Sequence, residues 1–242
     1  MAIVVPVLGM VATRTGWITF QIGFLCLALG LVFGSIAFFS ALVGHVIVAA
    51  KGLGPTTDRP SRLHLRLAGG GLMGLAVSIF VVLLFMNALR YPSIYDISTD
   101  VNDPPVFIAA IELRGVDSNP LVYNEKIAQV QQASYPDVKP YVHESLTVND
   151  AFELVRDLAV ELNWEIVTDD PENTVLEAVA TTFWYGFKDD IVVRIRQHAN
   201  NRGSTIDIRS ASRVGVSDVG TNARRIREFL RLVEQRANDR DG

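Results

Sequence analysis

The sequence predicts a two-helix transmembrane hairpin followed by a soluble α+β domain, whose antiparallel sheet of about four strands has helices packed on one face. The 242-residue chain changes in charge near residue 90. Residues 1–90 hold six Lys/Arg residues and one Asp, a net charge of +5, whereas residues 91–242 hold 16 basic and 25 acidic residues, a net charge of −9. The first part also holds two long uncharged runs, and the second holds alternating strand patterns between two amphipathic helical patterns.

The two uncharged runs cover residues 15–50 and 67–89. A helix of about 20 apolar residues crosses the hydrocarbon core of a bilayer, so we expect spans at about 20–48 and 67–89. Gly30-x-x-x-Gly34 and Gly70-x-x-x-Gly74 would let the two helix backbones approach closely. The lipid bilayer is therefore the first expected partner.

Basic residues set the expected orientation of the hairpin. The loop between the spans is more basic than the outer flanks, which favours a cytoplasmic loop and places both termini on the other side. The loop residues are Lys51, Arg59, Arg62 and Arg66, and the flanking residues are Arg14 and Arg90.

Residues 91–115 form an irregular collar that is rich in proline and in short polar side chains. Val101 and Phe107 stand where a calcium loop needs its turn glycine and its closing glutamate. We expect carboxylates that cap turns, with a calcium loop as the alternative. The alternating oxygen-bearing residues are Asp96, Ser98, Asp100 and Asn102.

A helix is expected over residues 148–162, because Thr147 and Asp150 resemble a capping box and apolar residues recur on one face. Strands follow at 164–168, 174–183, 190–197 and 204–210. In the third and fourth strands apolar residues alternate with polar ones, which predicts antiparallel strands with one buried and one polar face.

A final helix is expected at about residues 219–237, with Ser217 or Asp218 as its N-cap. The expected organisation is therefore a membrane hairpin at 1–90, a collar at 91–115, an α+β domain at 116–237 and a frayed tail at 238–242.

The densest polar segment runs from residue 208 to residue 225. A glycine-containing loop that leads into a helix offers backbone N–H groups, and Arg213 and Arg225 add forked donors that suit a carboxylate or phosphate. Arg213 and Asp218 could equally pair with each other, and with Asp189 or Asp190, and lock the turn without any ligand. Both readings, an anion site and a structural motif, stay open.

Three segments in order resemble the DUF1499 family: residues 186–191, residues 208–215, and residues 217–222 followed by Arg225 and Ile226. The resemblance covers roughly residues 91–233. It implies a domain of no established activity, found in bacteria and plastid-bearing eukaryotes and often preceded by membrane segments. It gives no roles to the matching positions, which are Asp189, Asp190, Arg209, Ser210, Ser212, Arg213, Asp218, Asn222 and Arg225.

An enzyme is the less favoured interpretation. Ser210 and Ser212 lie in no nucleophile-elbow sequence, and the two histidines outside the hairpin, His143 and His198, make a poor zinc set without a cysteine. Asp189 and Asp190 point to opposite faces of a strand, so one pocket can hold only one of them. We expect no catalytic residue, no metal and no cofactor, and the acidic domain argues against nucleic acid.

The favoured function is a membrane-anchored, non-catalytic protein. It would present its soluble domain at the non-cytoplasmic face, to bind a membrane-protein partner or to stabilise a membrane complex. The alternative is a binding module for an anionic small molecule or a lipid headgroup, and a hydrolase is the third hypothesis. The expected location is the bacterial inner membrane, with the C-terminal domain in the periplasm.

Overall fold

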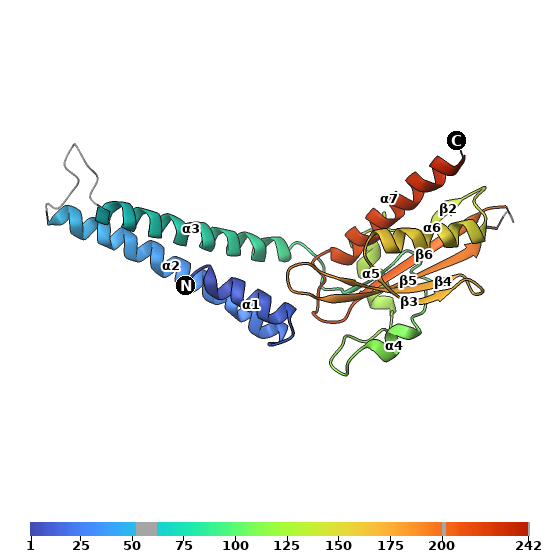
Figure 1. The fold of residues 1–242 in the computed structure, drawn as a ribbon, viewed down its shortest axis with the longest axis horizontal. Helices are drawn as coiled ribbons and strands as arrows, with labels where there is room; N and C mark the ends of the chain where they lie inside the picture. The colour runs from blue at the N-terminus through green and yellow to red at the C-terminus, as the bar shows by residue number, and fades with distance from the viewer. Residues whose placement is uncertain (52–61, 200–201, 242) are drawn as a thin grey trace. The chain divides into compact units, whose positions relative to one another are not determined.

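The computed structural model describes residues 1–51, 62–199 and 202–241 (Figure 1). The chain divides into two compact units, with one boundary between Arg90 and Tyr91. The first unit is Met1–Arg90 together with Trp184–Gly186, and the second is the remainder. The basic loop predicted between the spans falls largely on residues 52–61, which lie outside the described residues.

Within the described residues, the first unit contains the helices α1 (Val4–Arg14), α2 (Phe20–Ala50) and α3 (Arg62–Ala88). Both α2 and α3 are long and apolar enough to cross a membrane, and only 17% of the most apolar 18-residue stretch of each helix is buried. Side chains such as Phe39 and Leu83 are 61% exposed, which in water would leave a large apolar surface uncovered. The helices are therefore compatible with a membrane anchor, as the sequence predicts.

Small residues bring α2 and α3 together. A Cβ atom on Gly34 would lie 2.8 Å from the carbonyl oxygen of Gly74, so the helix backbones approach where only glycine fits. Ser35 and Ser78 share a hydrogen bond of 3.2 Å beside this contact. Gly70, in contrast, faces open space, so only one glycine of the second motif lies in the packed interface.

The second unit contains one antiparallel sheet with the strand order β1-β6-β5-β4-β3, and β2 pairs with the part of β6 that β1 leaves free. The predicted fold class is confirmed, although the sheet has six strands instead of about four. The strands are β1 (Asp96–Ser98), β2 (Tyr141–His143), β3 (Glu165–Asp170), β4 (Val175–Thr181), β5 (Lys188–Gln197) and β6 (Ser204–Ser212).

The two extra strands have three residues each, too short to show an alternating pattern against the irregular sequence around them. Each is held by pairing with β6, a contact that links residues far apart in the chain. This long-range pairing explains why local patterns did not predict them.

Helices α6 (Val148–Glu161) and α7 (Thr221–Asp241) cover one face of the sheet (Figure 1). Thr147 caps α6 as predicted, since its Oγ1 accepts a hydrogen bond of 3.2 Å from the Asp150 N–H. Ala159 of α6, Ile226 of α7 and Ile191 of β5 are fully buried between these layers.

The opposite face of the sheet carries polar side chains, as the alternation predicts, but it is buried and not solvated. Glu177, Val192 and Arg209 on that face are 0–3% exposed, because collar residues and the short helix α4 (Ala109–Leu113) cover them. The other short helix, α5 (Glu125–Ser134), binds the edge strand β1: the Gln131 side chain accepts from the Ser98 N–H and donates to its carbonyl oxygen. The collar is thus an integral layer of the domain.

Candidate functional site

Asp189 and Asp190 are neighbours on β5 and point to opposite faces of the sheet, as the strand geometry predicts. Asp189 faces α7, where Arg225 binds it. Asp190 faces the collar, where Arg114 and Arg213 bind it. The motif therefore forms two separate side-chain clusters instead of one pocket.

In the collar-side cluster, Asp190 lies between two arginines. Arg114 Nε donates to Asp190 Oδ2 at 2.7 Å, and Arg213 Nη2 donates to Oδ1 at 2.7 Å. The other two nitrogens of Arg114 donate to the backbone carbonyls of Asn119 and Ala211. Arg213 donates from Nη1 to the Leu113 carbonyl and from Nε to Asp190. All three nitrogens of each arginine are engaged within the domain.

In the helix-side cluster, Arg225 of α7 donates to Asp189 Oδ2 at 2.5 Å and to Ser210 Oγ at 3.0 Å, and it also contacts Asn222. Asn222 accepts from Ser210 Oγ at 2.8 Å and donates to Ser212 Oγ at 2.9 Å. This chain of polar contacts joins β5, β6 and the first turn of α7.

Arg209 of β6 forms a third buried pair, on the collar face. Its Nε and Nη2 donate to the two carboxylate oxygens of Asp96 at 2.9 and 2.7 Å, a bidentate geometry. The guanidinium carbon lies 5.0 Å from the ring centroid of Phe107 and 5.4 Å from that of Tyr123. Burial raises the pKa of the Tyr123 hydroxyl, so this ring stays neutral beside the ion pair.

Asp218 does not pair with Arg213, which was one of the expected contacts. Its Oδ1 accepts the Gly220 N–H and its Oδ2 accepts the Asn222 N–H, both at 2.8 Å, so the carboxylate caps the start of α7. Burial raises the pKa of this carboxyl group above its ordinary value of 3.8, against the opposing effect of the two N–H donors.

This pKa shift predicts a pH effect on stability. The folded state holds the Asp218 proton more tightly than the unfolded chain. The stabilisation that results is fully present below pH 3.8 and is lost as the pH rises through the raised pKa. Asp218→Asn keeps a capping oxygen but cannot titrate. We expect the free energy of unfolding of this variant, minus that of the unmutated chain, to be larger at about pH 7 than at about pH 4. Urea unfolding in mild detergent at both pH values measures this difference, and a difference that is the same at both would contradict it.

Asp100 has the turn-capping role expected for the collar. Its Oδ1 accepts the N–H groups of Asn102 and Asp103 at 3.1 and 3.0 Å. Asp96, the first residue of the supposed calcium loop, holds Arg209 with both oxygens. The contacts therefore fit the capping interpretation and not the calcium loop.

The two histidines of the domain lie away from the two serines. His143 pairs with Ser204 in the β2–β6 register, and Ser204 is six residues along β6 from Ser210, which corresponds to roughly 20 Å along a strand. His198 follows β5, and its Nδ1 lies 3.3 Å from Thr205 Oγ1, at the same distant end. Neither histidine is within proton-transfer reach of Ser210 or Ser212.

The structure adds residues to the clusters that the sequence patterns did not place there. Asp96 and Arg114 come from the collar and complete two of the three clusters. Glu177 of β4 is fully buried, and its carboxylate accepts the N–H groups of Ile108, Ala109 and Ala110 at 2.8–3.0 Å. Glu177 is the single charged residue within an apolar strand sequence. That was the one signal available for it, because a buried carboxylate needs hydrogen-bond donors nearby.

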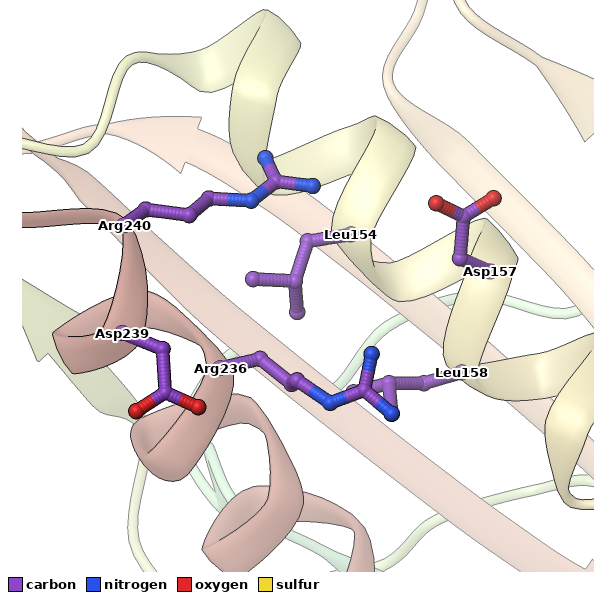
Figure 2. Close-up of a pocket in the computed structure, with 6 residues that line it drawn as sticks. All are labelled: Leu154, Asp157, Leu158, Arg236, Asp239 and Arg240. Carbon is purple, nitrogen blue, oxygen red and sulfur yellow. The ribbon is translucent and has the colours of Figure 1, made fainter.

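A groove with a volume of about 400 Å³ lies between α6 and α7, away from the three clusters (Figure 2). Arg236 at its edge pairs with Glu161 at 2.8 Å, and Arg240 donates to the carbonyl oxygen of Asp150. The groove is lined by Leu154, Asp157, Leu158, Arg236, Asp239 and Arg240 and contains none of the motif residues.

The fold and the clusters define an α+β domain, locked by buried ion pairs, that follows two helices long enough to span a membrane. A family model described as a protein of unknown function, DUF1499, matches residues 96–233, which is more than half of the chain. The chain therefore belongs to the DUF1499 family, as its motifs indicated. No curated protein matches the chain at a significant level.

Proposed function

We propose that this chain is a membrane-anchored, non-catalytic protein. Helices α2 and α3 would hold the α+β domain at the non-cytoplasmic face of the bacterial inner membrane, where the domain would bind a partner protein or stabilise a membrane complex. The observation that carries the proposal is the internal pairing of the motif. The Arg114, Arg213 and Arg225 side chains all bind Asp189 or Asp190, so these charges join parts of the domain to one another.

The same pairing weighs against the alternative of an anion-binding module. A phosphate or carboxylate ligand would have to displace Asp190 from Arg213, whose guanidinium already has all three nitrogens engaged. The hydrolase hypothesis needs a base beside Ser210 or Ser212, and the side chains that hydrogen-bond to the Ser210 hydroxyl are an amide and a guanidinium. Neither group removes a proton at neutral pH.

A surface for a partner protein is supported by the exposed face of α4. Ile108 and Ile111 are 69% and 62% exposed, although the α4 backbone is fixed by Glu177. Val106 and Leu113 flank them and are also exposed. Rigidly held apolar side chains of this kind are typical of protein-binding surfaces.

Copurification tests this surface. The full chain, extracted in mild detergent, is expected to carry a partner, and Ile108→Asp with Ile111→Asp is expected to remove most of it, because each charge would be buried in the contact. Val160→Asp is the matched control, since Val160 is exposed to 63% on α6. Elution of the unmutated chain alone at every detergent and salt condition would contradict the proposed function.

A further inference from the structure

Helix α1 runs antiparallel along the first half of α2, within the helical unit (Figure 1). A Cβ atom on Gly30 would lie 3.0 Å from the Ala2 carbonyl oxygen, and one on Gly23 would lie 3.3 Å from Thr13 Cβ. Gly9 is buried between these two levels. The two helices therefore pack closely along residues 23–30 of α2.

The contact between α2 and α3 gives the depth of this stretch in a membrane. A Cβ atom on Gly44 would lie 3.0 Å from the side chain of Leu67, the first residue of the second uncharged run, which places both at one edge of the apolar region. Along α2, Gly30 is 14 residues from Gly44, or about 21 Å, and Gly23 is 21 residues from it, or about 32 Å. Since the hydrocarbon core is about 30 Å thick, Gly23 would lie at its other edge and Gly30 about 10 Å inside that edge.

The face of α1 that is turned away from α2 is apolar and exposed. Val4, Val7, Leu8 and Val11 recur at helical spacing and are 46–62% exposed. Residues 1–13 contain no charged side chain. With 11 residues, α1 is too short to cross the core, which takes about 20 residues, but it is long enough to enter one leaflet.

The neighbouring residues continue this exposed apolar surface. Leu25 and Leu29 of α2, at the level of α1, are 58% and 37% exposed. Trp17, in the connection between α1 and α2, is 85% exposed and precedes Gly23. Tryptophan favours the headgroup region of a bilayer, because its ring is buried there while its N–H stays hydrated. The connection thus carries a side chain that suits the membrane edge at Gly23.

We propose that α1 is a third membrane element, which enters only the leaflet where α2 begins and presents its exposed face to the acyl chains of that leaflet. This inference rests on the proposed membrane anchor. A short helix is tolerated there because its backbone hydrogen bonds are internal and its other face packs on α2. Residues 1–13 would then lie inside the bilayer, whereas the charge pattern placed the segment before α2 outside it.

Spin labels on the full chain, reconstituted in phosphatidylcholine–phosphatidylglycerol vesicles, measure the depth of α1. With Cys26→Ala removing the natural cysteine, labels are placed at Val7→Cys, Trp17→Cys and Leu83→Cys, and at Glu172→Cys as the aqueous reference. A label in the bilayer collides more often with lipid-soluble oxygen than with a water-soluble nickel chelate, and the ratio rises with depth. We expect the ratio at Val7→Cys to be several-fold above that at Trp17→Cys and close to that at Leu83→Cys.

Leu83 is the depth-matched control on α3. Ser78 Oγ donates to the Leu31 carbonyl oxygen at 3.5 Å, and Leu83 follows Ser78 toward the membrane edge where α2 begins. Leu83 therefore lies level with the part of α2 that contacts α1, and its side chain is 61% exposed. Its label reports the anchor independently of α1.

If Leu83→Cys reads as lipid while Val7→Cys reads like Glu172→Cys, the anchor stands and the leaflet position of α1 is wrong. Equal ratios at Val7→Cys and Trp17→Cys would also overturn it, because α1 would then lie flat at the surface. Protection of Val7→Cys from both reagents would overturn it as well, since protein would cover the side chain instead of acyl chains. An aqueous reading at Leu83→Cys would contradict both the anchor and the leaflet position of α1.

Discussion

Replacing Arg209 by methionine is expected to destabilise the domain by about 3–5 kcal/mol, because it leaves the Asp96 carboxylate buried without its partner. Asp96 is fully buried and receives two hydrogen bonds from Arg209. The change also removes the donors to the carbonyl oxygens of Pro105 and Leu121, which fix the collar on the sheet. Urea unfolding of the full chain in mild detergent, monitored by near-ultraviolet circular dichroism, measures this loss of stability.

Arg231→Met is the matched control. Arg231 pairs with Glu228 on the exposed side of α7, with both side chains more than half exposed, and such pairs contribute about 0–1 kcal/mol. The double variant Asp96→Asn with Arg209→Met should recover part of the loss, since it removes the unpaired charge. A loss below about 1 kcal/mol in Arg209→Met would show that the pair does not hold the collar in place.

Asp190→Asn is expected to lower the free energy of unfolding by about 3 kcal/mol or more, because two largely buried guanidinium groups lose the carboxylate between them. Arg114 and Arg213 are 6% and 14% exposed in their side chains, so water cannot replace Asp190 fully. The same unfolding assay measures the change. A stability equal to that of the unmutated chain would contradict the role of Asp190 as the centre of a structural cluster.

The same residue separates the structural interpretation from the anion site. With Asp190 in place, inorganic phosphate and glycerol phosphate should leave the Tm of the full chain unchanged, because Arg213 is already neutralised. A rise in Tm with phosphate that disappears in Arg213→Ala would instead favour the anion-binding module. Thermal shift measurements at constant ionic strength distinguish the two, since salt alone screens surface charges.

Much of the fold could be predicted because its main elements carry local signals. The long apolar helices α2 and α3 come from long uncharged runs, and α6 shows its cap at Thr147 together with its apolar face. The alternation in β5 and β6 also predicted antiparallel strands correctly. It misled about the second face, because Arg209 and Asp190 look like solvated residues until their partners from the collar are known.

The sequence predicted which residues belong to the candidate site, but not which side chains bind one another. Sequence order placed Asp189 and Asp190 on opposite faces, which the contacts bear out. The partners Asp96 and Arg114 lie 113 and 76 residues away from the groups they bind, in a segment without a regular pattern. Contacts over such distances depend on how the whole sheet assembles, which no local motif encodes.

The central claim is that α2 and α3 hold the domain on the non-cytoplasmic side of a membrane. Cysteine labelling in intact cells tests it, in a Cys26→Ala background with Glu172→Cys in the domain or Thr57→Cys between the two helices. The account predicts that a membrane-impermeant maleimide labels Glu172→Cys in intact cells and labels Thr57→Cys only after lysis. Labelling of Thr57→Cys but not Glu172→Cys in intact cells, or recovery of the chain in the soluble fraction without detergent, would contradict it.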